Sequence, residues 1–110
     1  MGYRAYVVKA GSVDEYTRSE YFNRMEYEVH ELFDDYNIRF DSDFHRRKLK
    51  WAIKAVELNT LIALLEESPN EVCECFPKDR PYTNQELADI FKEWVEQADK
   101  EDGFVHIHWD

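Results

Sequence analysis

The longest apolar pattern in the chain runs from Asp41 to Glu67 and predicts one long helix. Its apolar residues recur at spacings of three and four, the period of a helix with one buried face: Phe44, Leu49, Ala52, Ile53, Val56, Leu61, Ile62 and Leu65. Asp41 or Ser42 is expected to cap its start, and Pro69 to stop it, because proline cannot continue a helix. Such a helix is roughly 39 Å long, so the other elements are expected to pack along it.

Two elements are predicted before this stretch. Aromatic and β-branched residues dominate Tyr3–Ala10 and predict a strand. Ser12 and Glu15 match a capping box, so a helix is expected from there to about Tyr36. Helical spacing assigns six residues to its buried stripe: Phe22, Met25, Val29, Leu32, Phe33 and Tyr36.

Three elements are predicted after it. Glu71–Phe76 is a candidate short strand. Thr83 and Glu86 form a second capping box, which opens a helix that Asp102-Gly103 is expected to stop. The inner face of that helix contains Leu87, Ile90, Phe91, Trp94, Val95 and Ala98. Phe104–Trp109 is the final strand, with alternating residues on its two faces.

These elements predict one α+β domain over residues 1–110. The expected order is strand, helix, long helix, short strand, helix, strand. Two or three strands would form a small sheet with three helices on one face. The first and last strands are the expected neighbours.

Composition adds an acidic character to this picture. The formal net charge is −10, and residues 66–110 alone carry four Lys/Arg and thirteen Asp/Glu, a net charge of −9. Such a field repels bare nucleic acid and anionic membrane, and it favours a basic partner. Neither an apolar run long enough to span a membrane nor a signal-peptide core is present, and only two cysteines occur. We therefore expect a soluble protein of the cytoplasm, with no contact to a membrane.

The predicted long helix carries the one basic cluster of the sequence: His45, Arg46, Arg47, Lys48, Lys50 and Lys54. One interpretation is a patch for nucleic acid or another anionic partner. The other is a solvated helix face that pairs with acidic segments of the same chain. The sequence alone leaves this choice open.

Carboxylates gather on two predicted helix faces. The first face interleaves them with tyrosines, which are enriched at protein interfaces: Tyr16, Glu20, Tyr27, Glu31 and Asp34. The second is a row on the C-terminal helix: Glu86, Asp89, Glu93 and Glu96. Like charges at this spacing do not stabilise a helix. Each face is either solvated or a partner-binding surface, and the row can imitate a phosphate backbone.

Residues that can perform chemistry are few. Cys73 and Cys75 would share a zinc-type ligand set with His106 and His108 if their strands were adjacent. Cysteines two apart on a strand diverge, so the spacing argues against a metal site. No glycine-rich phosphate loop or nucleophile elbow is present. We expect a non-enzymatic protein without a cofactor.

The opening Met1-Gly2-Tyr3-Arg4, leading into a strand, resembles the start of small proteins encoded by phages and prophages. The resemblance covers those residues, and size and acidity agree with it. It implies a phage-type inhibitor, anti-CRISPR-like, acting in the cytoplasm of a bacterial host.

The first functional hypothesis is therefore an acidic protein that occupies the nucleic-acid-binding surface of a basic protein. The alternative is a structural or assembly module that binds a partner, or a second copy as a homodimer, through apolar surface. Trp51 suggests this alternative, because it lies off the predicted apolar stripe. A small zinc-binding domain is the third reading.

Overall fold

Residues from both ends and the middle of the chain meet in one antiparallel sheet. The computed structural model describes residues 4–8, 16–18, 21–45 and 48–110. In chain order its elements are β1 (Ala5–Val8), β2 (Tyr16–Arg18), α1 (Glu26–Asp35), β3 (Asp41–His45), β4 (Lys48–Lys54), α2 (Ala55–Glu66), α3 (Asn84–Val95) and β5 (Phe104–Trp109). A Cα radius of gyration of 13.3 Å matches the roughly 13 Å of a single compact domain of this length.

The sheet has the strand order β2-β1-β5-β4-β3, and every neighbouring pair is antiparallel. Four strands have four or more residues, and β2 adds a three-residue edge. The prediction that the first and last strands are neighbours is confirmed, because β1 pairs with β5. The α+β class is confirmed as well.

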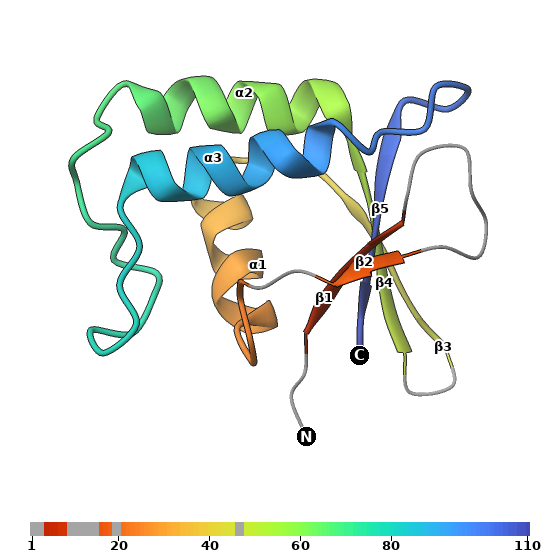
Figure 1. Cartoon of the computed structure of the whole chain (residues 1–110), viewed down its shortest axis with the longest axis horizontal. Coiled ribbons are helices and arrows are strands. Elements are labelled where there is room, and N and C mark those ends of the chain that lie inside the picture. The colour runs from red at the N-terminus through yellow and green to blue at the C-terminus, as the bar shows by residue number, and fades with distance from the viewer. Residues whose placement is uncertain (1–3, 9–15, 19–20, 46–47) are drawn as a thin grey trace.

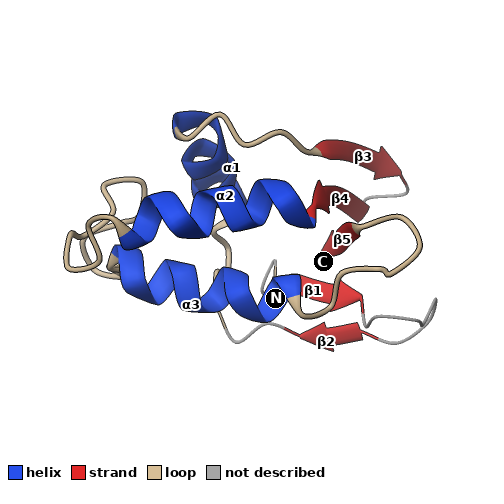
Figure 2. Cartoon of the chain, turned by 90° about the horizontal axis from the view of Figure 1, so that it is seen from above, coloured by secondary structure: helices blue, strands red, loops and turns tan. Residues whose placement is uncertain are grey.

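All three described helices lie on one side of this sheet (Figures 1 and 2). Figure 1 shows α2 and α3 side by side, with α1 crossing beneath them. Alternate strand residues face the helices and are buried, as the strand period requires: Ala5, Val7, Trp51, Ile53, Val105, Ile107 and Trp109. None of the described helices has the length and apolar character that crossing a membrane requires.

The predicted long helix over Asp41–Glu67 is wrong. The chain forms the hairpin β3–β4 first, and α2 begins only at Ala55. Leu49, Trp51 and Ile53 alternate with polar or small residues, and this strand period coexists with the spacings of three and four that predict a helix. Asp41 and Ser42 therefore pair with β4 instead of capping a helix.

Trp51 is also not where the sequence placed it. It is 1% exposed and lies on β4 at the centre of the core. Its ring centroid is 4.6 Å from that of Phe40 and 5.1 Å from that of Trp109. The apolar-surface alternative thus loses the residue that suggested it.

The first predicted helix is half right. Its second half is α1, where Val29, Leu32 and Phe33 are buried as expected. In its first half, residues 16–18 form β2 instead of a helix, and the capping box Ser12–Glu15 lies outside the described residues.

Phe22 lies between β2 and α1 in a left-handed backbone conformation, with φ of 62°. A bulky residue adopts such a conformation only where its surroundings impose it. Here the fully buried ring lies between 5.4 and 5.9 Å, centroid to centroid, from four aromatic rings: Phe76, Tyr82, Phe91 and Trp94.

The C-terminal half shows one error and one success. Glu71–Phe76 is not a strand, because only an isolated bridge joins Val72 to Thr83. The helix after Thr83 is confirmed, although it ends at Val95, well before Gly103. Both bonds of the capping box form, since the Glu86 N–H donates to Thr83 Oγ1 and the Thr83 N–H donates to the Glu86 carboxylate.

Candidate functional site

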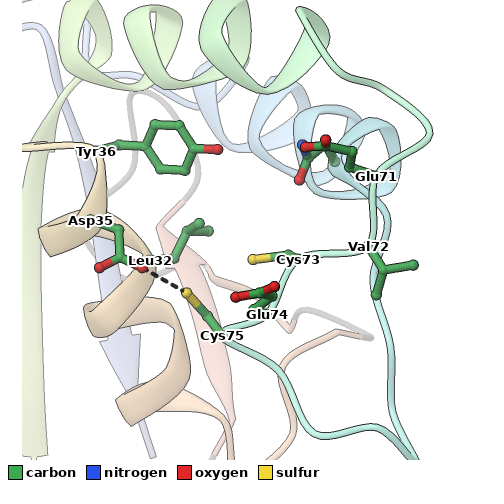
Figure 3. Close-up of a pocket in the computed structure, with 9 residues that line it drawn as sticks. Leu32, Asp35, Tyr36, Glu71, Val72, Cys73, Glu74 and Cys75 are labelled. Carbon is green, nitrogen blue, oxygen red and sulfur yellow. Dashed lines mark hydrogen bonds between the residues drawn. The ribbon is translucent and has the colours of Figure 1, made fainter.

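An acidic pocket lies where α1 meets the connection between α2 and α3 (Figure 3). It encloses about 480 Å³, a volume within the usual range of ligand pockets. Nine residues line it: Leu32, Asp35, Tyr36, Glu71, Val72, Cys73, Glu74, Cys75 and Asn84. They come from the end of α1, from the α2–α3 connection and from the first residue of α3.

Asn84 holds the α2–α3 connection in place. It is buried, and its Nδ2 donates to the Ser68 carbonyl at 3.0 Å. Its backbone N–H donates to the Glu71 carbonyl at 2.8 Å, and the Cys73 N–H donates to the Tyr82 carbonyl at 2.9 Å. These hydrogen bonds fix the backbone of the α2–α3 connection and thereby position the side chains of Glu71 and Glu74.

The electrostatics of the pocket are one-sided. Asp35, Glu71 and Glu74 supply carboxylates, whereas the described lining includes no Lys, Arg or His. Burial, and then the negative charges of its neighbours, raise the pKa of Tyr36. An ammonium or guanidinium group would find compensating charge and hydrogen-bond acceptors here.

Cys75 is held in a protonated state within this environment. Its Sγ donates a hydrogen bond to Asp35 Oδ2 at 3.2 Å (Figure 3). Burial first, and then this hydrogen bond, raise the pKa of the thiol well above its usual range. Because the thiolate is the reactive form of cysteine, this arrangement disfavours a nucleophilic role.

The predicted carboxylate row does lie on α3, and its members have different surroundings. Glu86 closes the capping box. Asp89 accepts a hydrogen bond from Gln85 Nε2 at 2.9 Å and lies 3.9 Å from Lys92 Nζ. Among the described residues, the exposed carboxylates of Glu93 and Glu96 have no hydrogen bond or ion pair, so these two are the members available to a partner.

The predicted tyrosine–carboxylate face does not exist as one helix face. Tyr16 belongs to β2, and Glu20 lies outside the described residues. Tyr27, Glu31 and Asp34 are exposed on α1, with Tyr27 at 75% exposure. Asp34 is 3.3 Å from the ring nitrogen of His30.

The proposed zinc ligands lie in separate parts of the fold. Cys73 and Cys75 are in the α2–α3 connection, whereas His106 and His108 are on β5, whose neighbours are β1 and β4. His106 instead contacts Asp102 at 3.1 Å. Within the described part of the chain, no group of three or more His, Cys, Asp or Glu residues is placed to hold a metal ion.

The basic cluster is only partly described. Arg46 and Arg47 lie outside the described residues, and His45 and Lys48 are strand residues. Lys50 and Lys54 are exposed on β4. They lie on a sheet instead of the predicted helix face.

No pattern in the sequence predicts the acidic pocket. Asp35 and Cys75 are 40 positions apart, and no periodicity relates them. The one usable signal is local, namely the acidic Glu71 and Glu74 on either side of Cys73. Comparisons add no second source of information: no protein-family model matches the chain, and no curated protein or solved structure shows significant similarity to it.

Proposed function

We propose that this protein is a non-enzymatic binding protein whose acidic side occupies the basic, nucleic-acid-binding surface of another protein. The observation that carries this proposal is the acidic pocket, which three carboxylates line without a cation in the described lining. A lysine or arginine side chain of the partner supplies that cation. Phage-encoded inhibitors of host nucleic-acid machinery, anti-CRISPR proteins among them, are the class in which we place it.

The carboxylates of Glu93 and Glu96 extend the acidic character along α3. They are exposed and have no partner among the described residues, so a basic surface can approach them without breaking an internal ion pair. Glu66 differs, because it accepts a hydrogen bond from Lys92 at 2.9 Å. We therefore assign the contact to the pocket and to the C-terminal half of α3.

Three double variants with the same change in charge test this assignment. Glu71→Lys/Glu74→Lys alters the pocket, Glu93→Lys/Glu96→Lys alters α3, and Asp41→Lys/Asp43→Lys alters exposed carboxylates on β3 as a control. Each is immobilised and exposed to bacterial lysate, and captured proteins are identified by mass spectrometry. The proposal expects the wild type and the β3 control to capture a nucleic-acid-binding protein that both other variants lose.

Displacement provides the second measurement. If the acidic side takes the place of nucleic acid, added DNA or RNA releases the captured protein from the wild type. Binding should also weaken with salt, because charges are screened over about 8–10 Å at physiological ionic strength. Capture that survives both treatments, or equal capture by all four proteins, would refute the proposal. A molecular mass in solution that rises with protein concentration, and that is the same for the wild type and the charge-reversal variants, would instead support the assembly module or homodimer.

A further inference from the structure

The edge of the sheet formed by β3 is open in the described part of the structure. β3 is the last strand in the order β2-β1-β5-β4-β3, and Figure 2 shows it outermost at that edge. Its backbone pairs with β4, and no other backbone hydrogen bond reaches it from the described residues. Every second residue of an edge strand directs its N–H and C=O outward, so β3 offers hydrogen-bonding groups to a further strand.

Exposed side chains accompany this open edge. Asp41, Ser42, Asp43 and Phe44 are all exposed. Phe44 is 67% exposed, whereas every other phenylalanine of the chain is buried or half-buried. An exposed ring beside unpaired backbone groups favours the addition of another strand, because aromatic pairs across two strands stabilise a sheet.

The charges along the chain at β3 decide which strand fits. The strand begins with Asp41 and Asp43, and residues 45–48 after Phe44 read His-Arg-Arg-Lys in the sequence. Negative charge thus precedes Phe44, and basic residues follow it. Such a strand is complementary to a second copy of itself that runs antiparallel, since the acidic start of each strand then lies beside the basic end of the other.

One register satisfies both the charges and the ring. An antiparallel pair centred on Phe44 places the two Phe44 residues opposite each other, and it places Asp43 opposite His45 of the second copy. A pair centred on Asp43 would instead place two like charges opposite each other, which destabilises a sheet. Residue identity therefore selects a single register, as strand pairing requires.

Charges elsewhere in the molecule leave the carboxylates of β3 available. Asp43 lies across from Lys50 on β4, and Asp41 lies across from Ala52. Among the described residues, neither carboxylate has an ion pair or a hydrogen bond. In Figure 1 the acidic pocket lies at the end of the molecule away from the sheet, and charges are screened over about 8–10 Å. The pocket therefore does not repel a second copy at this edge.

We propose that β3 pairs edge to edge with β3 of a second copy, which joins two sheets into one continuous sheet of a two-fold symmetric dimer. Symmetry makes each contact occur twice. The edge has five residues, so we expect a reversible dimer that dissociates on dilution. This inference goes beyond the proposed function and uses neither the acidic pocket nor α3, so either can fail without the other.

Sedimentation velocity of the full-length protein over a range of concentrations measures the dissociation constant of the dimer. Asp43→Lys should raise this constant about tenfold or more, because two symmetric contacts change from attractive to repulsive. Glu93→Lys is the matched control, since it makes the same change in charge at an exposed residue of α3. It should leave the constant within about twofold, because it lies outside the contact.

A charge exchange separates a lost contact from a damaged fold. Asp43→Lys/His45→Glu restores opposite charges across the two strands, so its dissociation constant should return to within about threefold of the wild type. Circular dichroism shows whether each variant is folded. This response to charge distinguishes the β3 dimer from a homodimer that forms through apolar surface alone.

Removal of the ring tests the centre of the contact. Phe44→Ala should raise the dissociation constant about fivefold, because the aromatic pair at the symmetry axis is lost. Tyr27→Ala is the matched control, since Tyr27 is an aromatic residue with 75% exposure on α1. This control should dimerise like the wild type.

Disulfide cross-linking determines the register. In a Cys73→Ser/Cys75→Ser background, Phe44→Cys places two thiols opposite each other with Cα atoms about 5 Å apart, a distance that a disulfide spans. Ser42→Cys is the control, because in the same register its two copies are roughly 14 Å apart. After air oxidation, mass spectrometry should find a covalent dimer for Phe44→Cys and a monomer for Ser42→Cys.

Three results would overturn the proposal. The first is a wild-type protein that stays monomeric at every concentration. The second is equal weakening by Asp43→Lys and Glu93→Lys, which would indicate a general effect of net charge. The third is cross-linking of Ser42→Cys as efficient as that of Phe44→Cys, which would indicate a contact with another register or another surface.

Discussion

Cys75 shows at the residue scale how the acidic pocket changes ordinary chemistry. The thiol is partly exposed, yet burial and the hydrogen bond to Asp35 raise its pKa. A group whose pKa is raised in this way stays protonated at a pH where a free cysteine begins to ionise. The pocket thus contains a protonated, neutral thiol beside three carboxylates.

We predict slow alkylation of Cys75 and a faster reaction after Asp35→Asn. Removing the carboxylate lowers the thiol pKa, and the thiolate fraction at pH 8 rises about tenfold for each pKa unit removed. Iodoacetamide kinetics followed by mass spectrometry in a Cys73→Ser background measure the rate at one thiol. Asp34→Asn is the control, since the neighbouring Asp34 contacts His30 instead. Equal rates for wild type and Asp35→Asn would contradict the role of the hydrogen bond.

Trp51 and Phe44 form a second comparison at this scale. Both are aromatic residues of the β3–β4 hairpin, but Trp51 is 1% exposed and Phe44 is 67% exposed. We predict that Trp51→Ala lowers the free energy of unfolding by about 3–5 kcal/mol through lost burial and a cavity. Phe44→Ala should change it by about 0.5 kcal/mol or less. Urea denaturation measures both, and similar losses would place Trp51 outside the core.

The elements of this fold differ in how locally they are specified. Helix α3 carries its own start signal, because the side chains of Thr83 and Glu86 each accept a hydrogen bond from the backbone N–H of the other residue. Helix α2 has no side-chain cap at Lys54, and it follows β4 without a loop. Its start is instead held from outside, since the Ala55 N–H donates to the Gly103 carbonyl at 2.9 Å.

We predict opposite effects for two threonine-to-alanine variants. Thr83→Ala removes the cap of α3 and should lower the free energy of unfolding by about 1 kcal/mol. Thr60→Ala lies inside α2, where the hydroxyl donates only to the Val56 carbonyl of the same helix. Alanine has the higher helix propensity, so Thr60→Ala should be neutral or slightly stabilising. Urea denaturation measures the free energy of unfolding of both variants. A larger loss for Thr60→Ala than for Thr83→Ala would contradict this account.

On the scale of the whole molecule, the dominant feature is the unequal distribution of charge. The chain has a formal net charge of −10, and part of the excess is in the acidic pocket, at the end away from the sheet, and on α3. Among the described residues, Lys92 pairs with Glu66 and Asp89, but Glu93 and Glu96 have no such partner. Repulsion among the carboxylates of the acidic pocket and among those of α3 therefore opposes folding.

We predict that moderate salt stabilises the protein. Screening weakens the repulsion, so raising sodium chloride from about 20 to about 200 mM should increase the melting temperature by roughly 2–5 °C. Glu93→Lys/Glu96→Lys should show a smaller increase, because it removes part of the repulsion. Thermal denaturation followed by circular dichroism gives both values. A melting temperature that falls with salt would mean that attractive ion pairs dominate.

Local patterns in the sequence were enough for the features that depend on neighbouring residues. The α+β class, helix α3 with its capping box, the second half of α1 and the strands β1 and β5 follow from periodicity and from start signals a few residues apart. The acidity of the C-terminal half is also a property of the sequence itself. These features need no knowledge of which distant segments meet.

Contacts between distant segments decided the rest. Asp41–His45 has a composition poor in strand formers and becomes β3 because β4 offers a partner at the sheet edge. Trp51 is buried because rings from α1, the α1–β3 connection and β5 surround it. The acidic pocket exists only after the chain has folded, since burial and backbone hydrogen bonds bring together residues that no local pattern relates.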